Sequence, residues 1–135
     1  MKKLRVLVVD DSELFRTSVI KIIQPYAAQI DEAKEGFETF LMVHKAMEKN
    51  EPYDLILLDL NMPQFRGEEF IKKVKESAAL HNLQDVPKII ILSSELSKAK
   101  MVELISAGCQ DYLKKPFQPE ELISKVKESF KDLDS

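Results

Sequence analysis

The sequence predicts an α/β domain in which a parallel sheet is covered by helices on both faces. Three segments, 4–9, 55–58 and 88–92, are near-continuous aliphatic runs, the pattern of central strands buried on both sides. Stretches with helical spacing of apolar residues lie between these runs. The 135 residues suit one domain, 1–135, with a core of its own. Alternation of strand and helix therefore indicates a doubly wound sheet.

The expected elements alternate strand and helix five times. Two weaker strands, around 29–33 and 110–113, complete the set. In chain order, the helices contain the apolar positions of 14–23, 37–43, 70–74, 101–105 and 122–130. Helix ends are marked by capping, proline and glycine residues at Ser12, Pro25, Gly108 and Pro119. Five such units suit the strand order 2-1-3-4-5, in which sites lie at the carboxyl ends of the strands.

The charge balance argues against a protein that binds nucleic acid or an anionic membrane. The net charge of -3 comes from 20 basic and 23 acidic side chains scattered along the chain, which leaves no basic surface. No apolar stretch approaches the roughly 20 residues that span a bilayer. We therefore expect a cytoplasmic protein with no membrane insertion and no direct contact with nucleic acid.

Residues that serve thiolate or imidazole chemistry are few. The single cysteine, Cys109, excludes an internal disulfide, and we expect it to be a small buried side chain. His44 and His81 have no partner at ligand spacing, so we expect both to be surface residues. The sequence thus predicts no site built on histidine or cysteine.

Polar residues follow the predicted strands at the point where each strand ends. These are Asp10 and Asp11 after the first strand, Asp59 after the third, Ser93 and Ser94 after the fourth, and Lys114 and Lys115 after the fifth. Because the carboxyl ends of parallel strands meet at one edge of the sheet, we expect these side chains to converge. Any one of the acids alone would be interpreted as a helix cap or a loop residue. Their coincidence favours a site.

Three carboxylates in one place need neutralisation, since each pair at about 4 Å repels by about 4 kcal/mol at an effective dielectric near 20. A shared proton, Lys115 or a hard cation would supply it. A donor set of oxygen atoms favours Mg²⁺, or a similar ion such as Mn²⁺, over zinc. With a cation and a lysine beside it, Asp59 is placed as a nucleophile toward phosphorus, and Ser93 can donate a hydrogen bond to the same group.

Four motifs, VVDDS, LILLDLNMP, ILSSE and DYLKKPF, occur in order and at suitable spacing. With them the chain resembles, over essentially its whole length, the receiver domains of two-component response regulators, in particular stand-alone chemotaxis-type members with a flavodoxin-like fold. The resemblance implies that Asp59 is the phosphoacceptor and that Asp10, Asp11 and the backbone carbonyl of Asn61 serve the metal. It also implies Lys115 as the site lysine, preceding a cis bond to Pro116, Ser93 as the switch hydroxyl and Tyr112 as the switch aromatic.

The same resemblance implies a mechanism and partners. A histidine kinase or a phosphotransfer protein would donate the phosphoryl group, and the fourth helix, fifth strand and fifth helix would form a face for a downstream protein target. Expected partner contacts on that face are Leu96, Met101, Tyr112 and Lys125. The chain would be a monomer or a phosphorylation-dependent dimer.

The sequence allows one further arrangement and disfavours two other functions. The chain would equally suit the receiver portion of a longer regulator with an output domain. An aspartyl-nucleophile phosphatase is disfavoured, because such enzymes place the nucleophile after the first strand with a second acid two residues on, whereas Asp10 and Asp11 are adjacent. A nucleotide or flavin binder is disfavoured by only three glycines and no phosphate-cradling loop. The sequence therefore predicts a phosphoacceptor switch rather than an enzyme.

Overall fold

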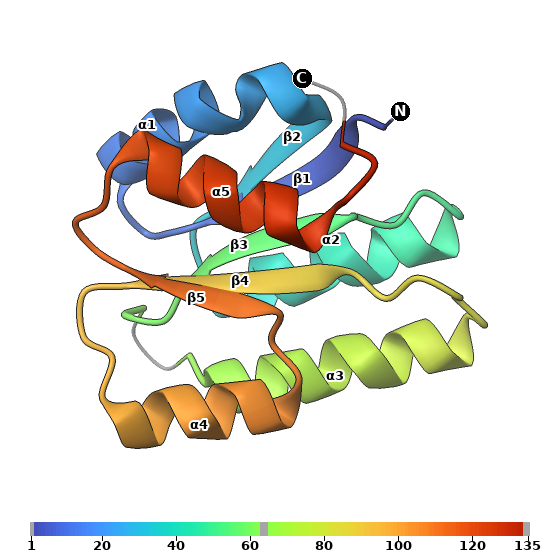
Figure 1. Cartoon of the computed structure of the whole chain (residues 1–135). Coiled ribbons are helices and arrows are strands. Elements are labelled where there is room, and N and C mark those ends of the chain that lie inside the picture. Colours follow the sequence, from blue (N-terminus) through green and yellow to red (C-terminus); the bar gives the residue numbers. More distant parts are fainter. Residues whose placement is uncertain (1, 63–64, 134–135) are drawn as a thin grey trace.

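The computed structural model describes residues 2–62 and 65–133, and it confirms the predicted α/β class. Pro63, the last residue of the LILLDLNMP motif, and Gln64 lie outside the described residues. The elements are β1 (Leu4–Val9), α1 (Glu13–Ile23), a 3₁₀ turn η1 (Gln24–Tyr26), β2 (Ala27–Ala33), α2 (Gly36–Glu48), β3 (Leu55–Asp59), α3 (Gly67–Leu80), β4 (Lys88–Ser93), α4 (Lys98–Ala107), β5 (Asp111–Lys114) and α5 (Pro119–Ser129). The strands form one parallel sheet in the predicted order β2-β1-β3-β4-β5 (Figure 1).

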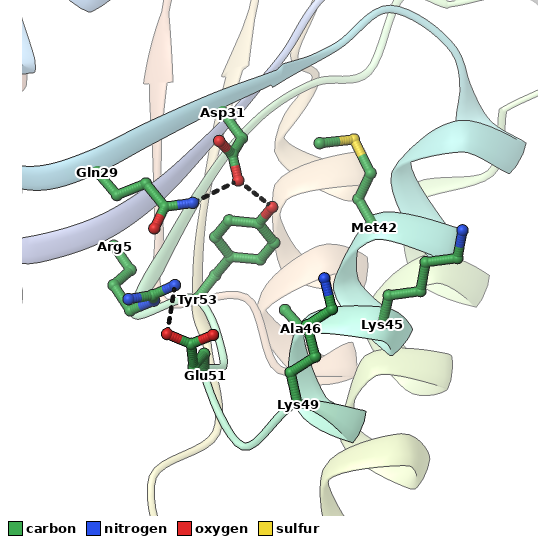
Figure 2. A pocket seen from close by; sticks show the side chains of 9 residues that line it. All are labelled: Arg5, Gln29, Asp31, Met42, Lys45, Ala46, Lys49, Glu51 and Tyr53. Carbon is green, nitrogen blue, oxygen red and sulfur yellow. Dashed lines mark hydrogen bonds and ion pairs between the residues drawn. The ribbon is translucent and has the colours of Figure 1, made fainter.

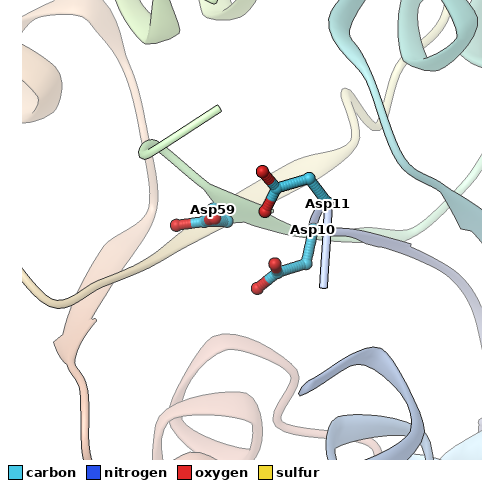
Figure 3. Close-up of side chains that lie close together, drawn as sticks. All are labelled: Asp10, Asp11 and Asp59. Carbon is cyan, nitrogen blue, oxygen red and sulfur yellow. The ribbon is translucent and has the colours of Figure 1, made fainter. Parts of the chain in front are cut away.

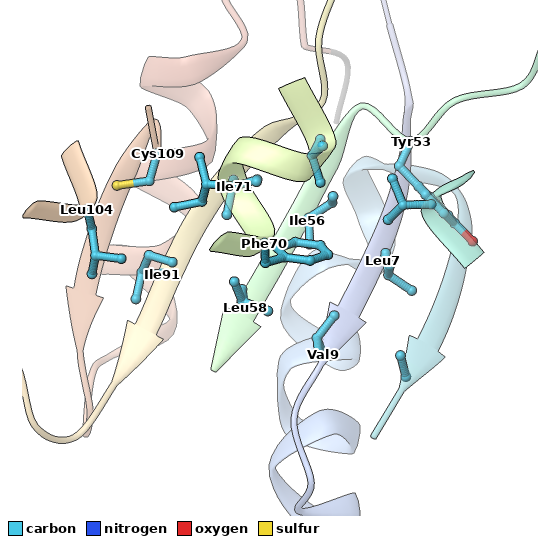
Figure 4. Packing of buried hydrophobic residues seen from close by; sticks show 14 of the residues in the cluster. Leu7, Val9, Tyr53, Ile56, Leu58, Phe70, Ile71, Ile91, Leu104 and Cys109 are labelled. Carbon is cyan, nitrogen blue, oxygen red and sulfur yellow. The ribbon is translucent and has the colours of Figure 1, made fainter. Parts of the chain in front are cut away.

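Helices cover both faces of the sheet, α1 and α5 on one and α2, α3 and α4 on the other (Figure 1). Successive side chains of a strand point to opposite faces, so each central strand supplies both layers of the core. On β3, for example, Ile56 and Leu58 pack toward α2 to α4, while Leu55 and Leu57 pack toward α1 and α5. Figure 4 shows the first of these layers, where Phe70 and Ile71 of α3 lie over β3. Unbroken aliphatic strands therefore reflect burial on both sides.

Element boundaries differ from the prediction by a few residues. After Pro25, one 3₁₀ turn leads directly into β2, which therefore begins at Ala27 rather than 29. In the fifth strand, Gln110 donates its backbone N–H to Ile89 (2.8 Å), but the strand itself begins at Asp111. The caps are as predicted for α1, where the Ser12 hydroxyl accepts a hydrogen bond from the Phe15 N–H (3.2 Å).

Several apolar residues that were expected to face the core lie on the outside of their helices. On α4 only Leu104 is buried, whereas Val102 and Ile105 are 65% and 50% exposed. Leu14 on α1 and Phe37 on α2 are 81% and 72% exposed.

Cys109 is buried as expected, and burial raises the pKa of its thiol to about 11. His44 and His81 lie at the surface as expected, each partly exposed, but they also pack against each other because α2 and α3 lie side by side. Among the described residues, no helix is both long enough and apolar enough to cross a membrane.

The end of α4 depends on Gly108. Its backbone adopts the left-handed conformation (φ 115°, ψ 19°), and its N–H bonds to the carbonyls of Leu104 and Ile105 (3.1 and 3.0 Å). Only glycine takes this conformation at no steric cost. A Cβ at this position would also overlap the end of the Lys75 side chain.

We expect Gly108→Ala to lower the free energy of unfolding by about 1–2 kcal/mol, the cost of a left-handed residue with a Cβ. Urea unfolding measures this change. In a Lys75→Ala background the overlap with Lys75 disappears and the backbone cost remains. Ser106→Ala, on the exposed side of the same helix, serves as the matched control and should be close to neutral. Equal stability of Gly108→Ala and wild type would contradict the conclusion that the left-handed backbone at position 108 requires glycine.

Candidate functional site

Three acidic side chains meet at the carboxyl edge of the sheet, as predicted. Asp10 and Asp11 follow β1, and Asp59 is the last residue of the neighbouring strand β3 (Figure 3). One carboxylate oxygen from each residue lies within 4.8 Å of the others. Asp10 and Asp59 are each 3% exposed, whereas Asp11 is exposed to solvent. The cluster is therefore half embedded in the domain and open on one side.

Lys115 supplies the positive charge nearest to these acids. Its Nζ lies 2.9 Å from Oδ2 of Asp10 and 3.5 Å from Oδ1 of Asp59. The Lys115 N–H donates to the backbone carbonyl of Ser93 (2.8 Å), which continues the β4–β5 pairing to this residue, and the Lys115–Pro116 peptide is cis, as the resemblance implied. The ammonium group also lies 3.7 Å from the centre of the Phe15 ring. This cation–π contact holds the lysine from the side of α1.

The surroundings of Asp59 raise the pKa of its carboxyl group above the ordinary value. Burial raises the pKa of its carboxyl group, and the negative charge of Asp10 raises it further. The Asn61 N–H, which donates to Oδ1 of Asp59 (3.1 Å), and the charge of Lys115 act in the opposite direction. One lysine against three carboxylates leaves negative charge uncompensated. A divalent cation would reverse this balance.

Two further contacts fix the end of β1. The Ser12 N–H donates to Oδ1 of Asp10 (2.9 Å), and Arg16 donates from Nη1 to the Asp10 backbone carbonyl (2.7 Å). Arg16 also pairs through Nε with Glu32 on β2 (3.0 Å). Sequence reasoning missed Arg16 and Phe15. No motif marks them, and only the packing of α1 beside β1 brings them to the site.

The ends of β3 and β4 are connected by hydrogen bonds through Asn61. Its side-chain amide donates to the Ser94 hydroxyl (2.9 Å), and its carbonyl oxygen lies 3.4 Å from the hydroxyl of Ser93. Ser93 is fully buried and also accepts from the Glu95 N–H (3.3 Å). Ser93, the last residue of β4, therefore lies beside Asn61 at the carboxyl edge of the sheet. The role of Ser94 as a partner of Asn61 was not predicted.

The four expected partner residues lie on or beside α4, β5 and α5. Tyr112 is half-buried on β5, with the Lys125 ammonium 5.7 Å from its ring centre, and Lys125 pairs with Asp111 (3.1 Å). Met101 is partly buried on α4, and Leu96, in the segment that precedes α4, packs against the core. The most exposed apolar side chains of this face are instead Val102 and Ile105.

A hollow lies between β2 and α2, away from the acidic cluster (Figure 2). It has a volume of about 290 Å³, and its lining includes charged residues from β1, β2, α2 and the segment that follows α2. Asp31 accepts hydrogen bonds from the Tyr53 hydroxyl (2.6 Å) and the Gln29 amide (3.0 Å), and Arg5 pairs with Glu51 (3.6 Å). Burial, together with the bond to Asp31, raises the pKa of Tyr53. We interpret this hollow as a structural network that anchors Tyr53.

The donor set of the acidic cluster fits a hard divalent cation. Asp10, Asp11 and Asp59 offer carboxylate oxygens alone, and no cysteine or histidine is part of the group. Such ligands suit Mg²⁺ or Mn²⁺. The convergence of three acids is costly without a cation and less so with one, and the cluster therefore has the donor set and spacing to hold such an ion.

We expect Asp59→Asn to raise the free energy of unfolding, by on the order of 1 kcal/mol, in buffer without divalent cations. The folded state raises the pKa of Asp59. The stability that protonation contributes is therefore present below the ordinary carboxyl pKa and lost as pH rises through the folded pKa. The gain from the substitution should be largest at pH 7 and shrink as pH falls through that window. Urea unfolding at several pH values tests this, with the exposed Asp85→Asn as the control; a loss of stability at pH 7 would contradict it.

Comparison with known proteins agrees with this geometry. The family model of the response regulator receiver domain matches residues 6–127. The transcriptional regulatory protein ResD of Bacillus subtilis is 37% identical over 123 residues, which are 91% of this chain and 46% of ResD, so the chain spans about half the length of that relative. A chemotaxis protein CheY homolog of Campylobacter jejuni is 34% identical over 127 residues, 93% of this chain and 91% of the homolog.

Comparison with solved structures supports the same family and fold. The chemotaxis response regulator CheY4 of Vibrio cholerae superposes with a TM-score of 0.75 at 30% identity, covering 94% of this chain and 98% of CheY4. The five-stranded sheet, its order and the flanking helices therefore form a CheY-like, flavodoxin-like fold. The chain belongs to the response regulator receiver domain family of two-component signalling.

Proposed function

We propose that this chain is a phosphoacceptor switch in which Asp59 receives a phosphoryl group from the phosphohistidine of a histidine kinase or a phosphotransfer protein. One observation carries the proposal: a nearly buried carboxylate lies within 4.8 Å of two further acids and 3.5 Å from a lysine ammonium. Cations on both sides of a carboxylate are what an acyl-phosphate requires, because they neutralise the incoming phosphoryl oxygens.

In the transfer step, an oxygen of Asp59 forms a bond to phosphorus while the phosphorus–nitrogen bond of the donor breaks, and the imidazole leaves with the electron pair. Asp10, Asp11, Asp59 and the backbone carbonyl of Asn61 would hold the divalent cation. When bound, this cation neutralises charge on the transferring group. Lys115 exchanges its contact with Asp59 for one with a phosphoryl oxygen and remains paired with Asp10. The chain contributes mainly position and charge, so it acts as a phosphoacceptor switch rather than an enzyme with a small-molecule substrate.

The phosphoryl group acts on the rest of the domain through Ser93. The Ser93 hydroxyl donates a weak bond to Asn61, at 3.4 Å, which a phosphoryl oxygen can replace. Movement of Ser93 leaves space beside β4 into which the half-buried Tyr112 turns. Binding shifts the population between two packings only by its different contacts with each. The face of α4, β5 and α5 then changes, and Leu96, Met101, Tyr112 and Lys125 bind the downstream protein.

The chain is proposed as one receiver domain, residues 1–135, that works by itself as a monomer or a phosphorylation-dependent dimer. The Campylobacter jejuni homolog supports this, because the match covers 91% of it. A second arrangement is supported by ResD, of which the match covers 46%. In that arrangement the same switch would control an attached output domain.

We expect incubation with Mg²⁺ and acetyl phosphate to add one phosphoryl group to the chain, stable in acid and labile in base, as measured by intact mass. Asp59→Asn should remove the adduct completely, because it lacks the nucleophile. Asp85→Asn changes an exposed aspartate in the loop before β4, at the opposite end of that strand from the acidic cluster, so it is the matched control and should retain the adduct. An unchanged adduct in Asp59→Asn would show that another residue accepts the phosphoryl group. Chelation of Mg²⁺ should slow formation at least about tenfold, since the cation neutralises the phosphoryl oxygens.

We expect Ser93→Ala to accept the phosphoryl group but to lose most of the response of the α4–β5–α5 face. Hydrogen–deuterium exchange of residues 98–129 before and after phosphorylation measures this response. Ser94→Ala is the matched control, because the Ser94 side chain is exposed next to the fully buried Ser93, and it should retain the response. A full response in Ser93→Ala would exclude Ser93 as the switch hydroxyl.

A further inference from the structure

Three groups surround the ammonium group of Lys115. Its Nζ lies 2.9 Å from Oδ2 of Asp10, 3.5 Å from Oδ1 of Asp59 and 3.7 Å from the centre of the Phe15 ring, over the face of that ring. The lysine side chain is 18% exposed. An ammonium group has three N–H donors and no acceptor, so two carboxylates and one aromatic face match its donors in number. The electron-rich face of the ring therefore takes the place of a third anion.

The Phe15 ring is itself held in place by two parts of the chain. The Phe15 N–H donates to the Ser12 hydroxyl (3.2 Å), the cap of α1, and its ring meets Phe117 edge-to-face, with 5.9 Å between centres and 90° between planes. Phe117 follows Lys115 by two residues, and α1 and α5 lie side by side on one face of the sheet (Figure 1). Both rings pack against the core layer under these helices. The ring face that Lys115 meets is therefore fixed both by α1 and by the segment before α5.

The aromatic contact of Lys115 differs from its carboxylate contacts in its response to charge. A lysine has a flexible four-carbon stem, so its ammonium stays in one place only while its neighbours attract it. In the proposed transfer, Lys115 gives up its contact with Asp59, and the acids attract the ammonium less when they share a divalent cation. The ring of Phe15 carries no net charge that a cation or a phosphoryl group could neutralise. Its attraction for Lys115 therefore persists when the site is loaded.

We propose that Phe15 is a positioning residue, which keeps the Lys115 ammonium beside Asp59 so that it can meet an incoming phosphoryl oxygen. The proposal rests on the proposed role of Asp59 as the phosphoacceptor. Without the ring, the ammonium is free to follow Asp10 or to turn to solvent, and a smaller fraction of molecules has the lysine in place when the donor arrives. A charged group that is already in position lowers the barrier to transfer, because less reorganisation remains. Phe15 therefore acts through Lys115 rather than by contact with the phosphoryl group.

A purely structural role for Phe15 has a different signature. If the ring only filled the core layer under α1 and α5, leucine would replace it with little effect on phosphorylation, and tyrosine would perform no better than leucine. The two roles are separated by the electron-rich ring face, which leucine lacks and tyrosine retains. Phe15→Leu and Phe15→Tyr therefore form a pair of variants that tests the contact with Lys115 rather than the volume of the side chain.

The rate at which acetyl phosphate in saturating Mg²⁺ forms the phosphoryl adduct, followed by intact mass, tests the proposal. We expect Phe15→Leu to slow this reaction about tenfold, the order of effect of a cation–π contact that is mostly shielded from water, and Phe15→Tyr to react within about twofold of the wild-type rate. Phe40→Leu makes the same change in a partly buried ring of α2, on the opposite face of the sheet, so it is the matched control and should leave the rate unchanged.

Proton NMR in buffer without Mg²⁺ provides a second measurement that does not depend on phosphorylation. A ring current moves protons over an aromatic face to higher field, so we expect the ε-methylene signals of Lys115 to lie upfield of their position in Phe15→Leu. Equal positions of these signals in the two chains would overturn the positioning role. Equal reaction rates in wild type and Phe15→Leu, or equal slowing in Phe15→Leu and Phe15→Tyr, would overturn it as well. A wild-type chain that forms no adduct would instead overturn the proposed function on which this role rests.

Discussion

The mutual repulsion of Asp10, Asp11 and Asp59 is the constraint on which the rest of this molecule depends. A parallel sheet brings the ends of β1 and β3 together, and the aliphatic strands behind them provide a low-dielectric wall in which charge is poorly screened. Lys115 offsets part of the repulsion by bonding to Asp10 and Asp59 together. The remaining repulsion between the carboxylates is left unbalanced, and the proposed cation would relieve it.

The sheet can hold this unfavourable arrangement because its core is continuous on both faces. Side chains of β1, β3 and β4 contribute to the layer under α2 to α4 and to the layer under α1 and α5. Each buried aliphatic side chain contributes about 1.5–3 kcal/mol of transfer free energy, so a few of them exceed the repulsion between one pair of acids. Hydrogen bonds from Ser12, Arg16 and Asn61 then fix the strand ends locally.

Much of the fold and the charged core of the site could be predicted because both depend on simple periodicities. Strands that are buried on both faces are aliphatic throughout, and residues that follow parallel strands meet at one edge of the sheet. The positions of Asp10, Asp59 and Lys115 could therefore be predicted. Positions set by helix rotation could not be found in the same way. Phe15 and Arg16 reach the site because of the rotation of α1 about its own axis, and Val102 points outward because of the rotation of α4. Composition alone does not encode how a helix is rotated against the sheet. His44 and His81 meet only because α2 and α3 are neighbours, which no local pattern reports.

Exposure differs sharply within the acidic cluster: Asp11 is open to solvent, while Asp10 and Asp59 are almost covered. Magnesium gives up its water shell reluctantly and usually retains several waters when bound to protein. At the proposed cation site, a hydrated ion would therefore meet the exposed Asp11 first, and the covered oxygens of Asp10 and Asp59 would replace its water afterwards.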